Sequence, residues 1–130
     1  VEKTVLELQK NRPDFICLNF ANPDMVGHTG DFNAILKAVE VVDECTQNVV
    51  KEAINNEYKI LIIADHGNAD FVLNSDGTSN TTHTTNPVPC FLVNTEYEKI
   101  NSGILADVAP TVLKLMGIEK PQEMTGKSLV

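Results

Sequence analysis

The stretch from Lys59 to Asp70, KILIIADHGNAD, decides the expected fold. It opens with the apolar run Ile60–Ile63, and a run that is apolar at every position suits a strand covered on both faces. Asp65 and His66 follow almost at once. In open α/β sheets, ligands bind at the carboxyl ends of the strands, so this pair stands where such a sheet presents its chemistry. A carboxylate and an imidazole both bind divalent metals, which makes them candidate metal ligands.

Further elements are expected on both sides of this strand. Apolar runs at Phe15–Phe20 and Cys90–Val93 are typical of strands, as is Ile60–Ala64 itself. Helical spacing of apolar residues predicts a long helix over Asp31–Asn55, with Asp31 as its N-cap, and a second helix over Ala106–Met116. The predicted fold class is α/β, with a mainly parallel sheet flanked by helices. Three strands make a small sheet, so we expect part of the sheet to lie outside this chain.

Composition excludes several kinds of partner. The 130 residues carry a formal net charge of -8, which disfavours nucleic acid and anionic membranes, because both need a basic surface. No apolar run is long enough for a transmembrane helix. The three cysteines, Cys17, Cys45 and Cys90, have no metal-binding spacing and suggest reduced thiols in a cytoplasmic protein. The chain lacks an initial methionine and opens within a helical pattern, which predicts a segment of a longer protein.

The histidines indicate where the chemistry lies. His28 belongs to PDMVGHTG, His66 follows the central strand, and His83 lies in the polar stretch TSNTTHTTN. Asp24 precedes His28 by four residues, so a helical turn there would put both side chains on one face. Together with Asp65, five oxygen and nitrogen donors are expected to gather at one edge of the sheet.

These donors favour Mn²⁺, Zn²⁺ or Co²⁺ over Ca²⁺ or an iron–sulfur cluster. Five protein donors exceed one tetrahedral site, so two ions sharing a phosphate is the economical interpretation. Such ions would also reverse the negative local field that otherwise disfavours a phosphorylated ligand.

Simpler interpretations stay open for each part of the pattern. Asp24 and His28 could cap the long helix, His83 could be a surface histidine, and the Asp65–His66 pair could be a satisfied turn. Two glycines, Gly27 and Gly67, could only supply tight turns. Two polar residues, Asn68 and Asp70, could orient the ligands or simply be loop polarity.

Four strings in this order closely resemble the family of cofactor-independent (2,3-bisphosphoglycerate-independent) phosphoglycerate mutases: NFANPDMVGHTG, ADHGNAD, HTTNPVP and LADVAPTVLKLMGIEKPQEMTGKSL. The shorter motifs PDMVGH and ADHG resemble the metal-binding motifs of the wider alkaline phosphatase superfamily. The resemblance implies an alkaline phosphatase-like fold and an isomerase of glycolysis and gluconeogenesis. Such an enzyme interconverts 3-phosphoglycerate and 2-phosphoglycerate through a phosphoserine intermediate, using two Mn²⁺ ions.

The resemblance also assigns the ligands. By matching motifs, one ion would be held by Asp24, His28 and His83, and the other by Asp65 and His66. The family takes further ligands from an aspartate and a nucleophilic serine upstream, and substrate-binding arginines from a separate domain. None of these has a match here, since no nucleophile motif includes Ser75, Ser79, Ser102 or Ser128.

Residues 1–130 therefore resemble the C-terminal segment of the phosphatase-type domain of a mutase. We expect the parent to be a monomer acting on a small phosphorylated substrate, and this chain alone to be inactive and to hold at most one ion. Two alternatives remain. One is another superfamily metalloenzyme, such as a phosphopentomutase, a phosphodiesterase or a sulfatase, and the other is a non-catalytic metal-binding fragment.

Overall fold

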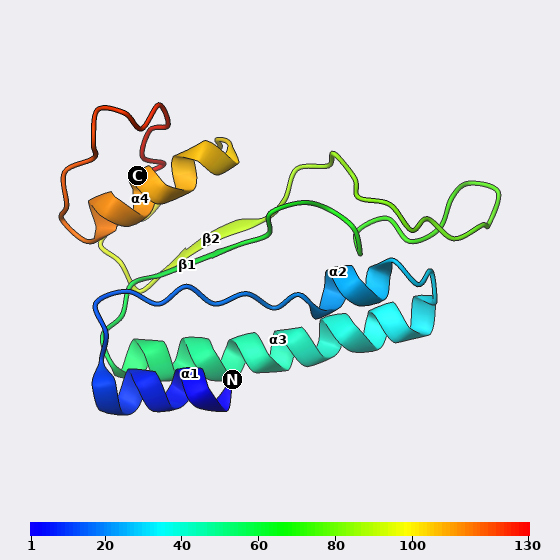
Figure 1. Ribbon diagram of the computed structural model, residues 1–130, viewed down its shortest axis with the longest axis horizontal. Coiled ribbons are helices and arrows are strands. Elements are labelled where there is room, and N and C mark those ends of the chain that lie inside the picture. Colours follow the sequence, from blue (N-terminus) through cyan, green and yellow to red (C-terminus); the bar gives the residue numbers. More distant parts are fainter. The chain divides into compact units, whose positions relative to one another are not determined.

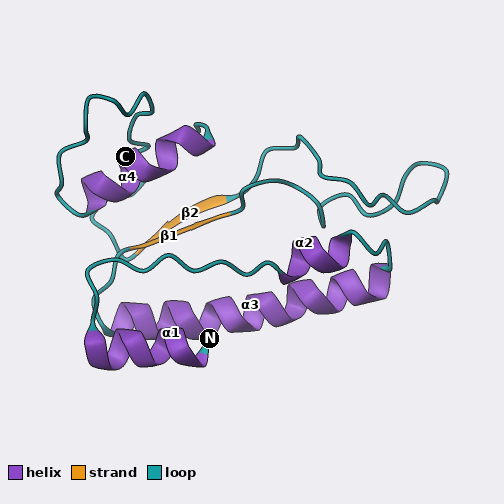
Figure 2. Cartoon of the chain, viewed as in Figure 1, coloured by secondary structure: helices purple, strands orange, loops and turns teal.

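The computed structural model describes all residues from 1 to 130, which divide into two compact units. The first unit contains residues Val1–Glu57 and His66–Val88, and the second contains Tyr58–Asp65 and Pro89–Val130. The chain forms a single sheet of two strands, and Figure 2 shows these short strands among helices and long loops. No helix combines the length and the apolar character that crossing a membrane would need.

Helix α3, Phe32–Asn55, is the longest element of the first unit. The predicted N-cap is confirmed, because the side chain of Asp31 accepts a hydrogen bond from the backbone N–H of Ala34 at 3.0 Å. The shorter helices α1 (Glu2–Leu6) and α2 (Asn22–Gly27) both pack against α3 (Figure 1).

The core of the first unit is small. A π-helical turn, Glu7–Asn11, continues α1 and contains the buried Leu8. The other buried apolar residues of this unit are Ile35 and Ala53 of α3. Residues 66–88 complete the unit as a long irregular loop. Single bridges tie this loop together, between Gly67 and Thr84 and between Leu73 and Ser79.

The second unit contains the only two strands. Strand β1 (Ile60–Ile63) pairs antiparallel with β2 (Cys90–Val93), in a register that sets Ile60 against Val93 and Ile63 against Cys90. Both strands were predicted at these positions, but the expected parallel sheet is not confirmed. A sheet of two strands leaves β1 only partly covered, and Ile63 is 37% exposed.

The predicted strand at Phe15–Phe20 is wrong. This segment joins no other strand, and Phe15 is 55% exposed. A strand exists only when a neighbour completes its hydrogen-bond ladder, and apolar sequence alone does not provide one.

The C-terminal residues fold around α4, Val108–Leu115, which the short 3₁₀ turn Leu105–Asp107 (η2) precedes. The predicted helix Ala106–Met116 thus begins with a tighter turn, and Gly117 ends it at φ +71° as a glycine cap does. The tail returns to this helix, where the backbone N–H of Leu129 donates to Thr111 Oγ1 at 3.0 Å.

Candidate metal centre

Helix α2 presents the first two donors. Pro23 lies in its first turn, where a missing N–H costs no hydrogen bond. Asp24 and His28 are one helical turn apart, and His28 Nε2 lies 3.3 Å from Asp24 Oδ1. The prediction that these side chains share one helical face is confirmed.

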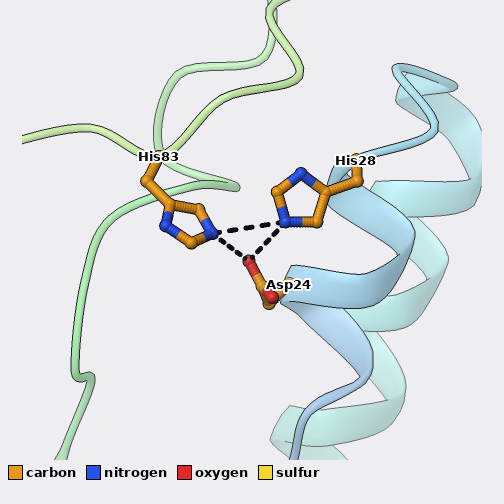
Figure 3. A group of neighbouring side chains, drawn as sticks. All are labelled: Asp24, His28 and His83. Carbon is orange, nitrogen blue, oxygen red and sulfur yellow. Dashed lines mark hydrogen bonds and ion pairs between the residues drawn. The ribbon is translucent and has the colours of Figure 1, made fainter.

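The long loop brings a third donor to the same point. His83 Nε2 lies 2.9 Å from Asp24 Oδ1 and 3.2 Å from His28 Nε2. Figure 3 shows the three side chains pointing toward one another, two from α2 and one from the loop. Their donor atoms all lie within 4.8 Å of one another. Residues 59 positions apart in sequence thus converge on one carboxylate oxygen.

A backbone contact fixes the tautomer and the orientation of the His28 imidazole. Its Nδ1 lies 2.8 Å from the carbonyl oxygen of Thr81. A carbonyl only accepts, so Nδ1 carries the proton and donates it. In the neutral ring, Nε2 then keeps its lone pair and faces Asp24 and His83. A metal-binding histidine is commonly oriented in this way, by a hydrogen bond from the ring nitrogen that does not face the metal.

His66 also lies near the carboxylate of Asp24. Its Nε2 lies 3.9 Å from Asp24 Oδ1, and its ring stacks on that of His83 with centroids 3.7 Å apart. Four of the five predicted donors therefore gather. The fifth, Asp65, falls in the second unit, and its place among the ligands stays a prediction.

Electrostatics keep Asp24 ionised. Desolvation by its surroundings opposes ionisation, but the attraction of His28 and the hydrogen bond from His83 outweigh it and lower the pKa of the Asp24 carboxyl. An ionised carboxylate is the form that a cation binds, so the site needs no proton loss from Asp24 at neutral pH.

The two polar residues left open by the sequence have different roles. Asn68 Nδ2 donates to Asp24 Oδ1 at 3.0 Å, so Asn68 does contact a candidate ligand. Asp70 instead accepts hydrogen bonds from Asn86 Nδ2 at 2.7 Å and from Thr84 Oγ1 at 3.0 Å. The bond from Asn86, followed by that from Thr84, lowers the pKa of Asp70. Asp70 therefore holds the loop that carries His83.

The interpretation of Gly27 and Gly67 as turn residues is wrong. Neither has a positive φ, so neither is needed for its backbone conformation. A Cβ on Gly67 would lie 2.1 Å from Thr84 Oγ1, and one on Gly27 would lie 1.9 Å from Asn68 Oδ1. Both are glycines because another side chain occupies the space of a Cβ.

The residues fit a divalent metal ion. One carboxylate and two imidazoles form a three-donor set, the number that leaves positions open for water or a substrate. No sulfur takes part, and this donor chemistry suits Mn²⁺, Zn²⁺ or Co²⁺.

The sequence did not predict the role of the Thr81 carbonyl, because every residue has a backbone carbonyl and no sequence signal marks the one that is used.

The donor cluster of Asp24, His28 and His83 could therefore hold a metal ion. A family profile described as the Metalloenzyme superfamily matches residues 1–120. The chain therefore belongs to the Metalloenzyme superfamily.

Individual relatives narrow this class. The chain is 52% identical over 129 residues to the 2,3-bisphosphoglycerate-independent phosphoglycerate mutase of Flavobacterium psychrophilum, covering 99% of this chain and 26% of that protein. It is 52% identical to the mutase of the same name from Bacteroides thetaiotaomicron, with 99% and 26% covered. The mutase of the same name from Clostridium acetobutylicum is 50% identical to this chain, and the match covers 98% of this chain and 26% of that protein.

A solved structure agrees. The structure of the Leishmania mexicana phosphoglycerate mutase at low cobalt concentration matches with a TM-score of 0.86 and 29% identity. The match covers 98% of this chain and 27% of that one. The chain thus spans about a quarter of the length of the proteins it resembles.

Proposed function

We propose that residues 1–130 are the metal-carrying C-terminal segment of the phosphatase-type domain of a phosphoglycerate mutase. The whole enzyme would interconvert 3-phosphoglycerate and 2-phosphoglycerate in the cytoplasm through a phosphoserine intermediate. One observation carries this: the donors of Asp24, His28 and His83 converge within 4.8 Å in a chain about half identical to named mutases.

The ligand assignment follows the geometry and the resemblance. Asp24, His28 and His83 would hold one Mn²⁺ ion, while Asp65 and His66 would contribute to the second. A bound divalent ion lowers the pKa of a coordinated hydroxyl and offsets the charge of a phosphoryl group. The chain's own residues supply the negative charge and the oriented lone pairs that select a cation.

The fold of the parent is also part of the proposal. An alkaline phosphatase-like domain has a mainly parallel sheet, and this chain contains two antiparallel strands. The remaining strands would come from the rest of the parent protein, which corresponds to the part of the relatives that this chain does not span.

This chain does not supply the rest of the chemistry. The hydroxyl of Ser79 donates to the carbonyl of Gly30, and that of Ser128 donates to the carbonyl of Val130. The only arginine, Arg12, donates to the carbonyl of Asn56 at the end of α3. No serine here matches a nucleophile motif, and no arginine is available to position a phosphorylated acid. We therefore expect the isolated chain to be inactive.

A chimera tests the proposal. The 26% of the Flavobacterium psychrophilum mutase that this chain matches is replaced by this chain, and turnover of 3-phosphoglycerate is measured with Mn²⁺. The chimera should be active, and the same chimera with His83→Ala should not be. Phosphopentose and phosphodiester substrates are assayed in parallel. Turnover of one of these instead would assign a different superfamily enzyme, and mutase turnover by the isolated chain would overturn the fragment assignment.

A second candidate is a metal-binding fragment without catalysis. The three-donor set lies wholly within the first unit, so it requires nothing from outside the chain. We expect at most one Mn²⁺, Zn²⁺ or Co²⁺ ion per chain. Calorimetric titration gives the stoichiometry, and two tight sites would contradict the division of ligands between two ions.

A further inference from the structure

We infer that Asn68 is a positioning residue that holds the carboxylate of Asp24 toward the imidazoles, and that Gly27 is a glycine to admit it. The inference rests on the proposed metal site and goes beyond its ligands. Asn68 is 8% exposed, one of few buried polar residues in the chain. Its side chain crosses from the long loop to α2, 44 residues away in sequence.

The chemistry of the contact fixes the direction of the amide. An ionised carboxylate only accepts hydrogen bonds, so the amide must turn its NH₂ group toward Asp24. Nδ2 lies 3.0 Å from Oδ1, the same oxygen that His83 and His28 approach. This bond favours the Asp24 rotamer that presents Oδ1 to the imidazoles. Without it, the carboxylate could turn about its side-chain bonds, because its other neighbours are half-exposed side chains.

Gly27 provides the space for this amide. A Cβ at position 27 would lie 1.9 Å from Asn68 Oδ1, 2.7 Å from Cγ and 3.0 Å from Nδ2. Real Cβ atoms do not approach other atoms so closely, so any side chain at position 27 must displace the amide. Asp24, Gly27 and His28 are at positions i, i+3 and i+4 of one helical face. The helical face that carries the candidate ligands Asp24 and His28 therefore also carries Gly27, which leaves the space that the Asn68 amide occupies.

A double-mutant cycle tests this inference on the full 130-residue chain. The four proteins are the wild type, Asn68→Ala, Gly27→Ala and the double variant, each checked for helix content by circular dichroism. Co²⁺ alone is the probe, because its visible absorption reports both affinity and ligand geometry. Asn101→Ala is the matched control. It also removes one amide hydrogen bond, from Nδ2 to the carbonyl of Leu129, but in the second unit.

We expect Asn68→Ala to weaken Co²⁺ binding by about 10- to 100-fold and to change the visible spectrum, as loss of a ligand-orienting partner does. Gly27→Ala should weaken binding similarly. The double variant should be no worse than Asn68→Ala, because the two changes break the same contact. The control should match the wild type. An unchanged affinity and spectrum in Asn68→Ala would overturn the inference, and so would additive effects in the cycle.

A metal-free measurement separates this inference from the proposed function. In the chain without metal, the imidazole ¹⁵N resonances of His83 report its contact with Asp24. They should shift in Asn68→Ala and Gly27→Ala and stay in place in Asn101→Ala. If the wild type binds no Co²⁺ but these resonances shift, the proposed function falls and the positioning role stands. If the resonances do not shift, the positioning role is overturned whatever the metal does.

Discussion

Asp24 and Asp107, one in each unit of the molecule, show how similar electrostatics can serve different purposes. Asp24 lies at an open site, where Oδ1 faces imidazole nitrogens and the amide of Asn68. Asp107 is 4% exposed and accepts hydrogen bonds from the backbone N–H groups of Ile104 and Lys127, both at 2.9 Å. The donors to Asp107 are backbone groups fixed by the fold, whereas three of the four groups around Asp24 are imidazoles that can turn toward a cation.

Both carboxyls have lowered pKa values, but the causes differ. The N–H groups of Lys127 and Ile104 lower the pKa of Asp107, and the imidazoles of His28 and His83 lower that of Asp24 against the opposing desolvation. A lowered pKa therefore does not by itself identify a functional carboxylate. The partners do: backbone N–H donors fixed by the fold indicate a structural role, whereas imidazoles that can give up a proton and bind a cation indicate a metal site.

The largest effect is expected on metal binding. His83→Ala removes one of three donors, so affinity for Mn²⁺ or Co²⁺ should fall by more than the roughly 100-fold that loss of an orienting partner reaches. His66→Ala should leave most of the binding, because His66 lies farther from Asp24. Asp107→Ala, provided it folds, should bind as the wild type does. Calorimetry measures all three, and the reverse order of the two histidine variants would show that the ligands are divided wrongly.

The next effect is on stability. Asp107→Ala leaves two backbone N–H groups without their acceptor and loosens the tail at Lys127. The melting temperature of the metal-free chain should fall by roughly 5 to 10 °C. Asp24→Ala should change it much less, since its partners are side chains at an open site. A larger loss in Asp24→Ala would reverse the comparison.

The pH dependence of stability follows from the sign of the Asp107 shift. Its folded pKa lies below the ordinary value of 3.8, so the stabilisation is present above that value and is lost as pH falls through the folded pKa. Urea midpoints between about pH 2 and 6 should therefore drop more steeply for the wild type than for Asp107→Asn. Parallel curves would show that this carboxylate does not couple protonation to folding.

The smallest effect is expected at a third carboxylate. On the surface, Glu96 Oε2 lies 2.8 Å from Lys59 Nζ, and the hydrogen bond from Lys59 lowers the pKa of Glu96. Solvent screens an exposed pair of this kind, and holding two long side chains together costs entropy. Lys59→Ala should leave the melting temperature nearly unchanged, and added salt should not alter the difference. A clear destabilisation would show that this pair contributes more than exposed pairs usually do.

Local patterns determined a large part of this protein. The apolar spacing and the N-cap of α3, and the one-turn separation of Asp24 and His28, follow from interactions within a few residues of each other. Such interactions depend on sequence order alone, so the sequence predicts them. It also placed the two strands, Ile60–Ile63 and Cys90–Val93, because their residues favour extended backbone.

Only the tertiary structure decided the partners of these elements. The antiparallel pairing of β1 with β2, and the lack of any ladder for Phe15–Phe20, depend on which strands are present to pair. The carbonyl of Thr81 that orients His28 belongs to a group that every residue has, so no sequence signal marks it. The fit of Asn68 into the space at Gly27 is likewise a matter of shape between residues far apart in the chain. Sequence specifies which donors exist, and packing over long distances determines what each of them faces.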